Sequence, residues 1–290
     1  MKGQREIVCN FCHQHGEGKK WYLAASNYSE DLLSDLRRRR FIGHFFTRGP
    51  ENMKKGENQL TKLDRLPALL RGFIRKKVTR RQMAHHFGQV IPIEDVEKIL
   101  EMATSVVRLA CICRQTFLGS EQRFCYGLTL APQANGLANI LKEIDASYLI
   151  GPQTAGLEYL PKEQALEHMR SCEQQGLCHT IWTFITPFIG GLCNCSLPGC
   201  MAMRTTVVHK TPVMFRGEYV AAVDPEKCLS CGQCQKICPF GAYLPTKNGD
   251  KAEVDVRKCY GCGICRSLCP AEAISLLDRQ SVPEVAQLWL

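Results

Sequence analysis

Apolar residues in the first hundred positions recur at the three- and four-residue spacing of an α-helix. Leucine-rich stretches at 32–36 and 63–73 show this pattern, and each is followed by a run of basic residues. A third pattern begins at Pro92 and continues through Ala103, with acidic residues in its first turn, where the helix dipole favours negative charge. The pattern predicts a basic, mainly helical N-terminal region over residues 1–104.

The middle of the chain mixes strand and helix patterns. The stretch 106–113 reads Val-Val-Arg-Leu-Ala-Cys-Ile-Cys and predicts a strand. Pro161 begins a helix that carries its apolar residues on one side and ends at Gly176. A further strand is predicted at 219–223, before the last unit. These elements predict a cysteine-rich α+β domain over residues 105–212.

One internal repeat dominates the last quarter of the chain. Its two copies, offset by 31 residues, are Cys228, Cys231, Cys234 and Cys238-Pro239, then Cys259, Cys262, Cys265 and Cys269-Pro270. Flanking residues repeat as well, since Val223-Asp224 matches Val254-Asp255. Each copy is too small to bury a core alone, so the pair predicts one pseudo-twofold module over residues 213–278. Residues 279–290 follow it as an apolar tail.

The 18 cysteines among 290 residues exceed what core packing requires. Disulfides, zinc and iron–sulfur clusters are the three explanations. The first residues lack the apolar core of a signal peptide, and the longest apolar run, 181–192, is too short to cross a membrane. The sequence therefore predicts a cytoplasmic protein with no membrane span, whose reduced thiols are free to bind metal.

The doubled run C-x2-C-x2-C-x3-C-P resembles bacterial-type ferredoxins with two [4Fe–4S] clusters. The resemblance covers residues 213–278 and implies a ferredoxin-like module of pseudo-twofold βαβ type within an α+β chain. It implies that one cluster takes Cys228, Cys231, Cys234 and Cys269, and the other Cys259, Cys262, Cys265 and Cys238. Two zinc sites are the alternative, but zinc ribbons use two separated C-x2-C pairs. A cofactor of this kind predicts low-potential electron transfer.

Eight further cysteines lie between residues 111 and 200. In an extended segment residues i and i+2 face the same way, so Cys111-Ile-Cys113 and Cys193-Asn-Cys195 can each present two corners of a cluster. With Gly176-Leu177-Cys178-His179 between them, these segments resemble multi-cluster ferredoxin-type proteins of anaerobes over residues 105–278. The resemblance implies at least one more [4Fe–4S] cluster. Its four ligands are expected among Cys111, Cys113, Cys193, Cys195 and Cys200, with Cys125 in reserve.

A second extra cluster would need all eight cysteines, including Cys172 and Cys178. Cys172 lies on the apolar side of its predicted helix, so packing is its expected role. His179 and Arg114 are candidates for a ligand, proton-donor or substrate role at a middle-domain cluster. A histidine beside aromatic residues is, however, more often a packed and hydrogen-bonded one.

Two other features have simpler readings. Cys9 and Cys12, with nearby histidines, suggest a zinc site, half of a cluster site or a reactive dithiol. Residues 1–110 contain 21 Lys and Arg against 12 Asp and Glu, so the whole formal charge of +9 belongs to them. The basic runs at 37–40 and 75–81 are expected to be a solvated surface or a docking patch for an acidic partner rather than a nucleic-acid site.

Three functions remain open on the sequence alone. The first is a multi-cluster electron carrier, or the wiring subunit of a larger oxidoreductase that exchanges electrons with redox partner proteins. The second is a reductase with chemistry at a middle-domain cluster, which requires an open site. The third is a redox-sensing nucleic-acid binder. No nucleotide loop or dinucleotide fingerprint is present in the sequence.

Overall fold

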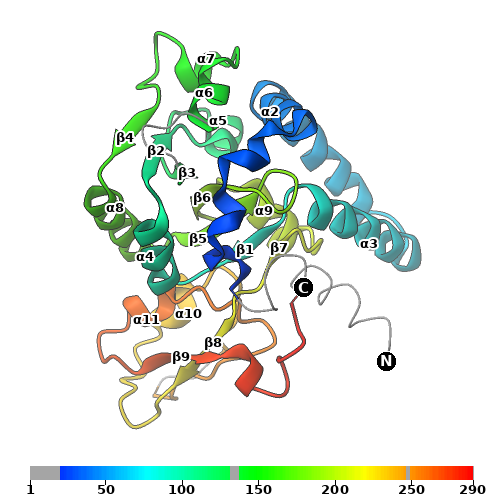
Figure 1. The fold of residues 1–290 in the computed structure, drawn as a ribbon. Helices are drawn as coiled ribbons and strands as arrows, with labels where there is room; N and C mark the ends of the chain where they lie inside the picture. The colour runs from blue at the N-terminus through cyan, green and yellow to red at the C-terminus, as the bar shows by residue number, and fades with distance from the viewer. Residues whose placement is uncertain (1–19, 131–136, 246–248, 290) are drawn as a thin grey trace.

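A computed structural model describes residues 20–130, 137–245 and 249–289 (Figure 1). Its N-terminal part is helical, as the sequence predicts. Three short 3-10 turns, η1 (Trp21–Leu23), η2 (Ala25–Tyr28) and η3 (Glu30–Ser34), precede the long helices α2 (Leu36–Asp64) and α3 (Ala68–His85). Asp35 caps α2 by accepting a hydrogen bond from the backbone N–H of Arg37 at 2.7 Å. Among the described helices, none combines the length and the apolar character that a membrane crossing needs.

Two details of this helical part differ from the expectation. The stretch 63–73 does not form one face of a single helix, because Pro67 separates α2 from α3. Its leucines also differ in burial, since the side chain of Leu63 is 6% exposed and that of Leu69 is 92% exposed. Of the four arginines at 37–40, Arg38 is buried rather than solvated. Its guanidinium donates to the backbone carbonyl oxygens of Phe184 and Ile185, at 3.0 and 3.1 Å, and so ties α2 to the sheet.

A seven-stranded sheet forms the centre of the molecule, with strand order β4-β2-β3-β6-β5-β1-β7. Its strands are β1 (Gly88–Val90), β2 (Ser105–Leu109), β3 (Cys125–Thr129), β4 (Glu158–Leu160), β5 (Cys178–Thr183), β6 (Ile189–Cys195) and β7 (Met214–Phe215). All neighbours are antiparallel except β1 and β7, which are parallel. The sheet therefore extends beyond the predicted domain 105–212, because β1 precedes that range and β7 follows it.

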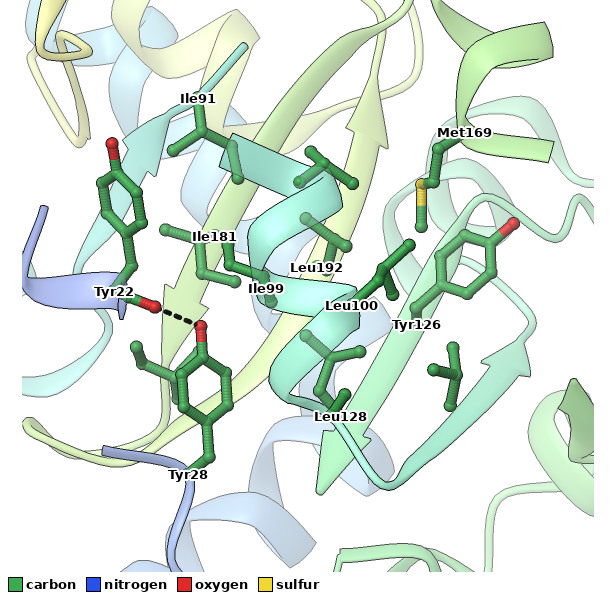
Figure 2. Packing of buried hydrophobic residues seen from close by; sticks show 14 of the residues in the cluster. Tyr22, Tyr28, Ile91, Ile99, Leu100, Tyr126, Leu128, Met169, Ile181 and Leu192 are labelled. Carbon is green, nitrogen blue, oxygen red and sulfur yellow. Dashed lines mark hydrogen bonds between the residues drawn. The ribbon is translucent and has the colours of Figure 1, made fainter. Parts of the chain in front are cut away.

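Helices α4 (Ile93–Met102) and α8 (Lys162–Gln174) pack together and cover one face of this sheet. Both begin after the prolines that the sequence indicates. Figure 2 shows the core beneath them, where Ile99 and Leu100 of α4 meet Leu128, Ile181 and Leu192 of the strands. Tyr28 closes one side of this core and donates to the carbonyl oxygen of Tyr22 at 2.6 Å.

The opposite face of the sheet carries most cysteines of the middle region, and α2 lies over it together with α5 (Ile112–Leu118). The predicted strand at 106–113 is too long. The strand β2 ends at Leu109, Cys111 is the N-cap of α5, and Cys113 lies in the first turn of that helix. Small elements complete the region: α6 (Leu137–Lys142), α7 (Ser147–Ile150), α9 (Met201–Met203) and η5 (Arg204–Val208), a π-helical turn.

The C-terminal module follows as a separate two-stranded sheet of β8 (Tyr219–Val223) and β9 (Ile274–Asp278), with α10 (Gln233–Ile237), α11 (Ile264–Ser267) and the turn η6 (Arg279–Ser281). Backbone hydrogen bonds in this module repeat with the same 31-residue offset as the cysteine runs. The N–H of Asp224 donates to Ala273 O at 2.8 Å, and that of Asp255 donates to Ala242 O at 2.7 Å. The same is true of pairing, because Val223 pairs with Ile274 and Tyr243 with Val254. The mixture of helices and sheets fits the α+β class.

Candidate metal centres

Four cysteines of the C-terminal module line one small cavity near the surface. We call them the outer set: Cys228, Cys231, Cys234 and Cys269. Three come from the first copy of the repeat, and Cys269 comes from the second. Cys231 is exposed and the other three are half-buried. The structure thus brings together the thiols that the ferredoxin resemblance assigns to one cluster.

The other four cysteines of the module form the inner set: Cys238, Cys259, Cys262 and Cys265. Their thiols lie close enough for each to affect the pKa values of the others, and burial raises the pKa of Cys238 to about 11. Cys259, Cys262 and Cys265 are only 7–8% exposed. The two copies of the repeat therefore differ in their surroundings, since one faces solvent and the other is enclosed.

Donors around both sets suit sulfur acceptors. Backbone N–H groups of Ala221, Ala242 and Ala273 donate to the sulfurs of Cys259, Cys238 and Cys269 at 3.3–3.4 Å. The buried hydroxyl of Tyr243 has no nitrogen or oxygen partner and lies against the thiol of Cys265. Such N–H···S and O–H···S contacts are the outer-shell interactions that iron–sulfur clusters use. The residues present therefore fit a [4Fe–4S] cluster in each set.

Two buried arginines add positive charge beside the inner set. Arg279 is 0% exposed and donates to the carbonyl oxygens of Gly217, Tyr219 and Cys259 at 2.7, 2.7 and 3.0 Å. Arg216 donates to Cys259 O at 3.1 Å. Burial lowers the pKa of Arg279 to about 10, which still leaves it charged at neutral pH. No sequence motif indicates these arginines.

Six cysteines of the middle region form a second kind of centre, which we call the six-thiol group. Cys193 donates to Cys125, with 3.5 Å between the sulfurs. Cys125 and Cys113 hydrogen-bond with Cys111, while Cys113 and Cys195 hydrogen-bond with Cys200. The contacts join Cys193, Cys125, Cys111, Cys113, Cys200 and Cys195 in one continuous chain. All five preferred candidates and the reserve residue Cys125 therefore lie together.

Local structure explains why two of these thiols ionise most easily. Cys111 is the N-cap of α5 and Cys200 is the N-cap of α9. A hydrogen bond from Cys113 is the main cause that lowers the pKa of each well below its ordinary value, and a backbone N–H of the following helical turn adds to the effect. Thiolates are the form that binds metal, and a helix N-terminus favours them. Cys111 and Cys113 lie in this group, but at the start of a helix rather than in the extended segment that the sequence predicts.

The two remaining middle-region cysteines are outside this chain of hydrogen-bonded thiols. Cys172 is fully buried on α8, on the other face of the sheet, with its sulfur 3.8 Å from Nδ1 of His168. Cys178 opens β5 and contacts Cys262 of the inner set, and the hydrogen bond between these two thiols raises the pKa of Cys178. The eight cysteines that two extra clusters would need are thus not gathered in one place.

His179 does not belong to the six-thiol group. It lies on the α8 face of the sheet, is 0% exposed, and its Nδ1 is 2.6 Å from Oδ1 of Asn194, whose Nδ2 contacts the sulfur of Met169. Burial lowers the pKa of His179 to about 4. Its position is that of a packed, hydrogen-bonded histidine, and its side chain is completely buried.

Arg114, the other polar candidate, lies beside the six-thiol group. Its guanidinium stacks over the ring of Phe124 at 4.2 Å and donates to Oε1 of Gln122 at 2.8 Å. It also lines a cavity of about 800 Å³ on the α2 side of the sheet, which all six thiols line as well. Helices α2 and α3 supply the far walls. No local sequence pattern indicates this cavity, because its walls come from segments more than a hundred residues apart.

Over the three described ranges, no group of three or more His, Cys, Asp and Glu side chains is already arranged around a single metal ion. The proposed zinc pair Cys9 and Cys12 lies outside the described residues.

In a comparison with known protein families, residues 221–270 match the model of a 4Fe-4S dicluster domain, which covers both copies of the cysteine repeat. A comparison with curated proteins gives no match. The module therefore has the character of an iron–sulfur electron-transfer unit, while the six-thiol group lies outside the matched residues.

Proposed function

We propose that the chain relays low-potential electrons inward, from a redox partner protein at the outer set, through the inner set, to the six-thiol group. In this role it acts as an electron carrier or as the wiring subunit of a larger oxidoreductase. The observation that carries the proposal is the contact between Cys178 and Cys262. It joins the inner set to the buried cluster of side chains that contains Cys195 and Cys200.

The exposure of the two sets supports this direction. The outer set, with Cys231 at the surface, is open to a partner. The inner set is enclosed, and Tyr260 beside it stacks on Phe240, with 4.1 Å between ring centroids. Redox partners meet briefly through small polar interfaces, so an exposed entry point and a protected interior suit a relay.

Charge supports the same direction. Positive charge near a cluster stabilises its reduced form, and net charge is one determinant of cluster potential. Arg279 and Arg216 lie beside Cys259 of the inner set. An electron that enters at the outer set is therefore more stable after it moves inward.

For the cofactors, we propose one [4Fe–4S] cluster in each of the three cysteine groups. When bound, the clusters supply one-electron redox chemistry at low potential. The six-thiol group offers two more sulfurs than one cluster needs, and Cys172 and Cys178 lie on opposite faces of the sheet, so we assign no fourth site. Iron analysis of anaerobically prepared protein is expected to give about twelve irons per chain, against about eight if the six-thiol group stays empty.

The relay is tested by supplying electrons from a protein too large to enter the cavity. We expect a reduced two-cluster ferredoxin to reduce the six-thiol centre of the wild type, followed by freeze-quench EPR. In the variant Cys228→Ser/Cys231→Ser this rate should fall at least about a hundredfold, while dithionite still reduces the centre. The variant Cys172→Ser serves as the matched control and should behave as wild type. An unchanged rate in the double variant would contradict the relay.

A second candidate function is favoured by the cavity. A reductase at the six-thiol centre would need an open site with polar groups beside it. The cavity of about 800 Å³ touches all six thiols and Arg114. In this case electrons arriving by the relay reduce a small molecule bound in the cavity rather than a second protein.

The basic surface supports a protein partner more than a nucleic acid. Arg37, Arg39 and Arg40 are exposed on α2, as are Lys76 and Lys77 on α3, but Arg38 is committed to backbone carbonyls and Arg75 pairs with Asp64 at 2.8 Å. These positive groups suit the docking of an acidic redox partner.

A further inference from the structure

We propose that the cavity beside the six-thiol group binds a neutral aromatic small molecule that carries a hydroxyl or N–H hydrogen-bond donor. The inference rests on the reductase as the second candidate function and names its substrate class. The cavity volume of about 800 Å³ lies within the range of about 300–1,000 Å³ that is typical of small-molecule sites. Part of that volume, against the thiols, is where a cluster would lie.

The walls away from the thiols are aromatic. The rings that line the cavity are Phe41, Phe45, Phe46, Trp182 and Phe184. Their planes are already arranged for ring contacts, since Phe45 meets Phe184 edge to face, with 5.4 Å between centroids. A planar ligand can add to such a set by stacked or edge-to-face packing, and each such pair stabilises the complex beyond the burial of its area.

His86 is a polar residue within these walls, and its ring is held in one orientation by two contacts. The ring of His86 stacks on Trp182, with 4.9 Å between centroids, and its Nδ1 lies 2.6 Å from the carbonyl oxygen of Thr183. A carbonyl only accepts hydrogen bonds, so Nδ1 carries the hydrogen. Burial lowers the pKa of His86 to about 4, which keeps the ring neutral at pH 7 and leaves Nε2 as an acceptor. A ligand with a donor group satisfies that acceptor.

In the part of the cavity walled by α2 and α3, the charges disfavour a cation. Among the described residues, Lys62 and Arg81 line that part and no Asp or Glu lines the cavity, while the ionisable thiols lie at the opposite wall. A positively charged ligand against the aromatic walls would therefore be desolvated beside like charges, with no opposite charge in contact. A neutral molecule meets no such penalty.

Binding is tested by calorimetry on the full, cluster-loaded chain under anaerobic conditions at pH 7. The probes are three naphthalenes of similar size: 2-naphthol, which has a donor; 2-methoxynaphthalene, which has none; and 2-(aminomethyl)naphthalene, which is a cation. We expect one molecule of 2-naphthol per chain, bound about 3- to 10-fold more tightly than the methoxy compound, the effect of one hydrogen bond. The cation should bind at least about tenfold more weakly than 2-naphthol.

Three variants locate the site. Val78→Trp places a large side chain into the cavity wall on α3 and should weaken 2-naphthol binding at least about tenfold. Leu69→Trp makes the same change on the same helix at a position that is 92% exposed, and should leave the affinity unchanged. His86→Phe keeps a ring against Trp182 but removes the acceptor, and should abolish the preference for 2-naphthol over the methoxy compound.

Equal binding of all three probes, no binding of any, or equal affinity of the two tryptophan variants would overturn the proposal. The measurement does not depend on electron flow. A chain that binds 2-naphthol as expected but fails the ferredoxin reduction test has the site without the relay, and the reverse result separates the relay from the site.

Discussion

The sulfur of Cys193 lies 3.5 Å from that of Cys125, and the two residues face each other directly across the antiparallel strands β6 and β3. Cys193 comes from a Cys-Asn-Cys segment that the sequence marks, while Cys125 has no motif of its own. Their contact extends the chain of thiols across the sheet, so the six-thiol group is defined by strand register as much as by sequence spacing.

In metal-free protein this pair is expected to form a disulfide under mild oxidation. Directly opposed residues on neighbouring strands have Cα and Cβ separations within the range that a disulfide requires. Treatment with diamide followed by peptide mass spectrometry should find the Cys125–Cys193 crosslink in the metal-free chain and not in the cluster-loaded chain. A crosslink that forms equally in both would show that neither sulfur is occupied by metal.

The two repeats differ at one position of their cysteine loops. Ser230 and Gly261 are equivalent and have φ angles of +57° and +74°. A Cβ at Gly261 would overlap the backbone carbonyl oxygen of Tyr219, so a side chain fits in the outer loop but not in the inner one. We expect Gly261→Ser to lose the inner cluster, about four irons of twelve, and Ser230→Gly to keep all of them. Iron analysis measures both, and equal iron content in the two variants would refute this explanation.

Arg279 is expected to raise the reduction potential of the inner set by its charge. Arg279→Gln removes the charge, whereas Arg279→Lys keeps it, and both lose the forked hydrogen bonds to Tyr219 and Cys259. The glutamine variant should show an inner midpoint potential lower by about 60 mV, a tenfold change for one electron, and the lysine variant much less. Redox titration followed by EPR measures the shift. Equal shifts would assign the effect to hydrogen bonding.

His179 predicts a loss of stability in mild acid. Its pKa is about 4 in the folded chain against an ordinary 6.5, so unfolding between these pH values takes up a proton that the native state lacks. Stability therefore falls as the pH falls through this window, by about 2 kcal/mol from this residue between pH 7 and pH 5. Anaerobic urea unfolding should show a weaker pH dependence in His179→Gln.

The matched control for that experiment is His85→Gln, at the exposed end of α3. It should retain the pH dependence of the wild type. If His179→Gln and the wild type lose the same stability between pH 7 and pH 5, the histidine is not the titrating group.

The sequence predicts those features that depend on short spacing. The two cysteine runs and the helices that begin after Pro92 and Pro161 are visible because neighbouring residues determine them. The apolar stretch 106–113 favours a strand that would include Cys113, yet Cys111 ends the extended segment as the N-cap of a helix. The position of His179 depends on which face of β5 it occupies, and the contact between Cys178 and Cys262 depends on how two sheets pack. Neither is encoded in local pattern.

The unequal burial of the two cysteine sets has a broader consequence. Duplication of one small unit would ordinarily yield a symmetric module whose two ends present equivalent surfaces to a binding partner. Here the rest of the chain covers the end that holds the inner set and leaves the end with the outer set exposed. The two ends of a nearly symmetric module therefore differ. If the chain exchanges electrons with a partner as proposed, that partner is expected at the exposed end, and this asymmetry arises from the attachment of the rest of the chain rather than from the duplicated unit itself.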